Sequence, residues 1–349
     1  GQTHINEDYN GSFTSPTLTT VRALNANAFG PGPISMKGRA RLELNGNNVA
    51  IANLNDVTIT TLNGTSFAPV VANGSGTTAA TLTLGSDNIT GPVFIGTFIN
   101  GSTQPLGLTK VGSGTFTVSG DSTTTGTIAV NAGTLALAAA TGVYPDSTAV
   151  TGSGSFSNAT LLTVAAGATL DVLGRGDQTL TLNNGQTLGG SGTVNGAVVT
   201  TSGGNIAPGS SVGTLTVAGN ITLGGNLTIE LNRALSPNSD RLVTSGGSIT
   251  GGGTLTLTNI GAVLQPGDTF QVFAAGVSGI TVPAQTVDYV NAVTYTWQNN
   301  IAASGTVTLL SVTPITAPTL NVGQSGNQLT FSWTGPFKLQ SQTNSLNVG

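Results

Sequence analysis

The chain has 349 residues, of which 51 are glycine, 14 are proline and none is cysteine, and only 6% are charged, with a net charge of −4. Because 38% of the residues are hydrophobic and charges are few, the composition excludes a disordered chain, and nine scattered Lys and Arg residues provide no basic stripe for nucleic acid. Without cysteine neither disulfides nor thiolate metal sites can form, and no apolar run reaches the ~20 residues of a membrane-spanning helix.

The N-terminal segment, residues 1–38, shows no regular alternation of apolar and polar residues. It contains the sole histidine, His4, and since a metal site needs three or four converging ligands, we predict no metal site here. We predict instead that the segment provides a strand to a neighbouring subunit. Ile5, Tyr9 and Phe13 are its candidate self-assembly contacts.

Residues 39–264 consist of short alternating segments separated by Gly, Asn, Ser or Asp. The stretch 108–137 is the clearest example, with segments at 115–118, 127–130 and 134–137 in which every second residue is apolar. This period indicates strands with one buried face, and glycine between them supports tight corners. Similar Thr-Leu-Thr-Leu units recur along the region without long connections, which favours a β-solenoid of stacked coils over a sandwich or a barrel. We expect inward ladders of apolar residues and outward ladders of Thr.

The C-terminal part divides into two further segments. Residues 265–312 form longer and more aromatic strands, which we interpret as the final coils and a cap over the open core. A proline-spaced linker begins residues 313–349, which end in a β segment that starts a small β-sandwich-like module. The candidate self-assembly contacts here are Phe331, Trp333 and Phe337. The candidate ligand contacts are Tyr289, Tyr295 and Trp297.

Two stretches resemble known families. Residues 108–115 (LTKVGSGT) followed by 130–135 (VNAGTL) resemble the autotransporter-associated β-strand repeat of bacterial passenger regions. The resemblance covers roughly residues 39–310 and implies a right-handed parallel β-helix that is exported to the cell surface. Residues 337–346 resemble the C-terminal segment of large secreted proteins from the Verrucomicrobia and Planctomycetes.

One function to be considered is that of an enzyme, because parallel β-helices also host polysaccharide lyases and hydrolases. Residues 209–213 match the G-x-S-x-G pattern of serine hydrolases, but the motif requires a histidine and a strand-to-helix turn that the surroundings lack. The acidic residues are scattered, and Asp171, Asp177 and Glu230 are the ones whose substitution would test catalysis. Calcium at Asp171 with Asp177, or at Asp240, is the alternative use of these carboxylates. We predict that the chain is not an enzyme and carries no cofactor or metal.

The sequence therefore predicts an extracellular structural protein. Its expected partner is a second copy of itself, joined head to tail into a fibre or surface stalk, because a solenoid ends in unpaired strand edges. The alternative is a monomeric adhesin passenger that binds a cell-surface or matrix polysaccharide, or a protein. We expect no nucleic acid partner and no membrane span, and we expect secretion to the cell surface.

Overall fold

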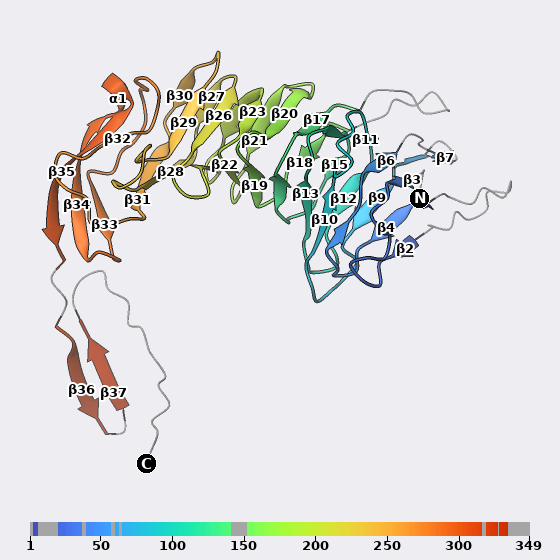
Figure 1. Cartoon of the computed structure of the whole chain (residues 1–349). Helices are drawn as coiled ribbons and strands as arrows, with labels where there is room; N and C mark the ends of the chain where they lie inside the picture. The colour runs from blue at the N-terminus through green and yellow to red at the C-terminus, as the bar shows by residue number, and fades with distance from the viewer. Residues whose placement is uncertain are drawn as a thin grey trace.

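The computed structural model describes residues 3–5, 20–36, 40–56, 60–62, 65–140, 152–315, 319–326 and 328–333. Nearly half of the chain (49%) is strand and 1% is helix. Figure 1 shows the strands stacked side by side along one long axis, with a separate sheet at the C-terminal end. This arrangement confirms the predicted parallel β-helix.

One face of the solenoid is a single nine-stranded parallel sheet, the longest continuous sheet in the described part of the chain, whereas the other two faces are divided among shorter sheets. From the N-terminal end its strands are β5 (Val49–Ala50), β10 (Ala80–Leu84), β13 (Leu106–Lys110), β16 (Ile128–Val130), β19 (Leu161–Val164), β22 (Thr187–Gly190), β25 (Asn205–Pro208), β28 (Asn226–Leu231) and β31 (Thr254–Asn259).

Two further faces complete the coils. The second consists of β1 (Thr3–Ile5), β3 (Ile34–Met36) and β6 (Leu54–Asp56), followed by β11 (Val93–Phe94), β14 (Thr115–Val118), β17 (Thr134–Ala138), β20 (Thr169–Gly174), β23 (Thr193–Asn195), β26 (Thr214–Ala218) and β29 (Arg241–Thr244). The third consists of β2 (Thr20–Arg22), β4 (Arg41–Glu43), β9 (Val70–Ala72), β12 (Thr97–Ile99), β15 (Asp121–Ser122), β18 (Ser155–Phe156), β21 (Thr179–Leu182), β24 (Ala197–Thr200), β27 (Ile221–Leu223) and β30 (Ile249–Gly251).

From β3 onward, the strands of the solenoid visit the three faces in turn. Thus β12, β13 and β14 form one coil, and β15, β16 and β17 form the next. Strand β16 pairs with β13, β17 pairs with β14, and β15 lies beside β12. A hairpin of β7 (Thr60–Leu62) and β8 (Thr65–Phe67) is inserted between two early coils. The regular order means that each residue contacts its equivalents in the coils before and after, as in other solenoids.

Inward and outward positions form ladders along the faces, as predicted. On the second face, Phe116, Leu135 and Leu170 lie in register and are buried. The outward ladder beside them is made of threonines, including Thr115 and Thr134, which are also in register. Apolar burial inside and β-branched packing outside stabilise both sides of the sheet.

An antiparallel sheet closes the C-terminal end of the solenoid, which is the predicted cap. Its order is β32–β35–β34–β33, and a one-turn helix α1 (Ile301–Ser304) joins β34 to β35. The strands are β32 (Thr269–Gln271), β33 (Gln285–Asp288), β34 (Val293–Asn300) and β35 (Thr306–Pro314). The chain then forms a separate hairpin of β36 (Asn321–Ser325) and β37 (Gln328–Ser332), the strand pair of the predicted C-terminal module.

Candidate functional surfaces along the solenoid

Lys110 is a buried cation in the most regular stretch of the chain. Its side chain is 1% exposed, and its Nζ donates to the carbonyl oxygens of Val111 (2.6 Å), Gly112 (2.9 Å) and Ala132 (3.3 Å). Burial lowers the pKa of Lys110, and the charge of Asp87 acts in the opposite direction. Because Ala132 lies in the next coil, the ammonium group joins two consecutive coils at their corner.

Replacing Lys110 with methionine is expected to lower the free energy of unfolding by about 2 kcal/mol, because charge-assisted hydrogen bonds to three carbonyl groups are lost while the apolar stem is kept. Chemical denaturation monitored by circular dichroism would measure this change. The matched control is Lys338→Met, which removes an equal charge from the C-terminal segment. Equal stability of the Lys110→Met variant and the parent would show that the ammonium group contributes nothing at this corner.

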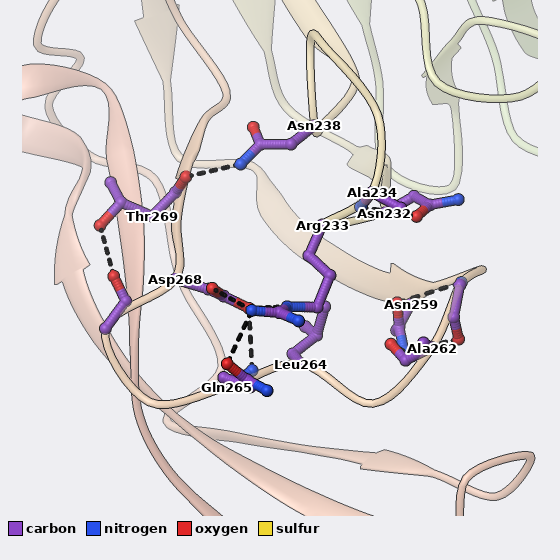
Figure 2. Close-up of polar contacts among 12 residues, drawn as sticks. Asn232, Arg233, Ala234, Asn238, Asn259, Ala262, Leu264, Gln265, Asp268 and Thr269 are labelled. Carbon is purple, nitrogen blue, oxygen red and sulfur yellow. Dashed lines mark hydrogen bonds and ion pairs between the residues drawn. The ribbon is translucent and has the colours of Figure 1, made fainter.

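A loop between β28 and β29 ties the solenoid to the cap (Figure 2). Arg233 on this loop donates from Nε to Asp268 Oδ2 (2.9 Å) and from a terminal nitrogen to Gln265 Oε1 (2.8 Å). Asn238 Nδ2 donates to the carbonyl oxygen of Thr269 (3.0 Å), and Gln265 N donates to Asp268 Oδ2 (2.8 Å). The contacts of Arg233 and Asn238 join this loop to residues more than thirty positions later, at the start of the cap. They therefore fix the cap on the last coils.

Asp288 ties the other side of the cap to β31. Its Oδ2 accepts hydrogen bonds from Asn259 Nδ2 (3.0 Å), Asn291 Nδ2 (2.8 Å) and the Tyr295 hydroxyl (3.0 Å). Burial by itself would raise the pKa of Asp288, but the hydrogen bonds from Asn291, Asn259 and Tyr295 hold the pKa below its ordinary value. The carboxylate is therefore the centre of a structural network.

The three aromatic residues predicted as ligand contacts line one depression of about 220 Å³ between β31 and the β33–β34 hairpin. Tyr289 is 59% exposed at its edge, next to Val290, which is 91% exposed. The rings of Tyr295 and Trp297 are almost fully buried and pack 5.9 Å apart in the cap. The structure thus brings the three residues together, but only Tyr289 presents a large surface to a partner.

The predicted self-assembly residues lie at opposite ends of the molecule where the structure describes them. Ile5 is the last residue of β1, which pairs with β3 of the same chain and leaves one strand edge without a described neighbour. Phe331 lies on β37 and is 42% exposed, and Trp333 follows directly and is half-buried. Tyr9, Phe13 and Phe337 lie outside the described residues.

Three of the four carboxylates considered for catalysis or calcium, those of Asp171, Asp177 and Asp240, have protein partners. Asp177 forms an ion pair with Arg175 (3.1 Å), and Asp171 Oδ1 accepts from Leu173 N (2.9 Å). Asp240 accepts from two backbone N–H groups and lies near Glu230. Within the described ranges no group of three or more His, Cys, Asp or Glu side chains could hold a metal ion.

Reasoning from the sequence did not select Lys110 or Asp240 as buried charges. A signal for Lys110 was present, since alternation from Leu108 places it on the inward side of its strand. Asp240 gave no such signal, because its partners, the N–H groups of Gly213 and Glu230, come from a neighbouring coil and from the far end of a loop. The 209–213 segment that matches the hydrolase pattern is a turn, in which Gly209 has φ +84° and bridges Gly190.

The stacked coils, the buried ladders and the cap define a β-solenoid made of sequence repeats. Comparison with family models identifies residues 108–137 as a passenger-associated-transport-repeat. This segment is therefore similar to a repeat of autotransporter passengers, which are regions that are displayed at the cell surface or secreted. A search of curated proteins finds no significant match. The matched stretch does not include residues 337–346, so their resemblance to other secreted proteins stays a prediction.

The repeat family and the β-helix together favour a structural or adhesive role for the chain. The matched segment runs from β13 to β17 and therefore covers one full coil of three strands and two of the three strands of the next. No helix in the described part of the chain is long and apolar enough to cross a bilayer.

Proposed function

We propose that this passenger region is an extracellular structural protein that joins end to end into a fibre or surface stalk. The observation that supports this proposal is the difference between the two ends of the solenoid. At the C-terminal end an antiparallel sheet covers the last coils. At the N-terminal end, β1, β2 and β5 are the outermost strands of their sheets and pair on one side only among the described residues.

Unpaired strand edges have N–H and C=O groups available to another strand. A contact between the C-terminal part of one copy and the N-terminal edges of the next is heterologous, because it joins two different surfaces. When such a contact does not close into a ring, it propagates as a filament.

Analytical ultracentrifugation over a range of protein concentrations, combined with negative-stain microscopy, tests this proposal. We expect the mass to rise with concentration and rods to appear whose thickness matches one solenoid. A variant lacking residues 2–20 should lose the rods while its circular dichroism spectrum stays that of a β-protein. A sample that remains monomeric at high concentration would contradict the fibre, and rods that survive the deletion would contradict the role of the N-terminal segment.

The second candidate is an adhesin that binds a polysaccharide or a protein at the depression beside Tyr289. The observation in its favour is the exposed tip of the β33–β34 hairpin, where Tyr289 and Val290 extend into solvent. Binding to acidic and neutral cell-wall polysaccharides can be measured with immobilised glycans. Tyr289→Ser should weaken binding at this tip, whereas Leu235→Ser, at another exposed apolar residue, should not. Equal binding by both variants would exclude this surface.

A further inference from the structure

The hairpin β36–β37 has one apolar and one polar face. Val322 and Phe331 form a cross-strand pair and are 58% and 42% exposed, and alternation places Leu320 and Trp333 on the same side. The opposite side contains the cross-strand pair Asn321 and Ser332. A two-stranded hairpin is marginally stable in water, and an exposed apolar face of this kind is typical of a contact surface.

The hairpin also lacks the features that normally protect strand edges. Residues 319–333 contain no charged residue and no proline. Natural proteins block exposed edges with lysine, proline or bulges to prevent pairing with other chains. The two outer edges of this hairpin are therefore suited to pairing with further strands.

The N-terminal end of the solenoid provides matching features. β2 is the outermost strand of its face, and Val21 on this strand is only partly buried against the core. Leu24 follows the strand and is 82% exposed. A sheet with an apolar face could cover this end as the antiparallel cap covers the other.

The hairpin cannot reach the N-terminal end of its own chain. Val322 lies eight positions after Pro314, the end of the cap, and eight fully extended residues span about 28 Å. The nine strands from β5 to β31 occupy about 38 Å at the usual spacing between strands. Figure 1 shows the hairpin beyond the cap, away from the N-terminal coils. Contact between these two surfaces therefore requires two chains.

We propose that the apolar face of β36–β37 in one copy covers the N-terminal end of the next copy, with Val322 and Phe331 packed beside β2 and Leu24. This inference rests on the proposed end-to-end association and names the two surfaces that form it. Because the apolar face lies after the cap and the open edges lie at the first coils, every copy has both halves of the contact.

Sedimentation velocity of two matched variants tests the hairpin. Val322→Thr with Phe331→Thr keeps strand-forming residues but removes apolar area, and about 1.5–3 kcal/mol per buried side chain corresponds to at least a tenfold weaker association. Asn321→Thr with Ser332→Thr changes the cross-strand pair on the polar face and should associate like the parent. Equal association of the apolar-face variant and the parent would overturn the inference but leave the proposed fibre intact. A parent that never associates would contradict the fibre itself.

Disulfide trapping identifies the partner surface, since the chain has no cysteine of its own. A Leu24→Cys and Val322→Cys double variant should form a ladder of covalent multimers under mild oxidation. The control combines Val322→Cys with Val290→Cys, at the exposed tip of the cap, and should form no ladder. Covalent dimers from Val322→Cys alone, or a ladder only in the control, would show that the hairpin packs on another hairpin or on the cap and would overturn the inference.

Discussion

Replacing Gly112 with alanine is expected to lower the free energy of unfolding by about 3 kcal/mol, because two penalties act at one corner. Gly112 has φ +69°, where a side chain costs about 1–2 kcal/mol. An added Cβ would also lie 2.0 Å from the carbonyl oxygen of Gly85 in the preceding coil. The backbones of the two coils would have to separate, and such overpacking typically costs a further 1–3 kcal/mol.

Gly176→Ala is the matched control. This glycine lies in a turn, has no positive φ, and an added Cβ would have no neighbour within 4 Å. We expect the control to be neutral or more stable by up to about 1 kcal/mol, since alanine restricts the unfolded chain. Urea denaturation of both variants measures the difference. If the two variants have the same midpoint, close contact between coils at Gly112 is not a source of stability.

The stability of the protein is expected to depend on the protonation of Asp240. Its Oδ1 and Oδ2 accept from Gly213 N and Glu230 N, both at 2.7 Å. Burial raises the pKa of Asp240 to about 6, these backbone hydrogen bonds act against the shift, and the charge of Glu230 adds to it. Because the folded pKa is above the unfolded one, the folded state favours the protonated form. The free energy of unfolding should therefore fall by up to about 3 kcal/mol as the pH rises from about 4 to above 6.

Asp240→Asn removes this titration while keeping the shape of the side chain. Measured by chemical denaturation, the stability difference between variant and parent should move in favour of the variant as the pH rises through this range. Asp171→Asn, at an outward position of β20, serves as the control for removing one carboxylate. A difference that is constant between pH 4 and pH 6.5 would show that Asp240 titrates with an ordinary pKa in the folded protein.

The solenoid and its cap could be predicted from local patterns. The alternation in segments such as 115–118 determines which side chains are buried, and β14 and β17 follow it residue by residue. The aromatic strands after residue 265 were expected to form the cap, and Phe270, Tyr295 and Trp297 are buried within it. These features depend on period and composition, which are local properties of the sequence.

Other features depend on which backbone groups the coils bring together. The φ of Gly114 is not positive, so its backbone conformation alone does not require glycine. Glycine is required there because an added Cβ would lie 2.2 Å from the carbonyl oxygen of Ile89. The site of Lys110 is completed by Ala132, twenty-two residues later, and that of Asp240 by Gly213, twenty-seven residues earlier. The sequence by itself determined the strands, their buried faces and the stacking. The tertiary structure decided where charges are buried and which strand edges have no neighbour among the described residues, because coil length varies and the register between coils is set only by packing.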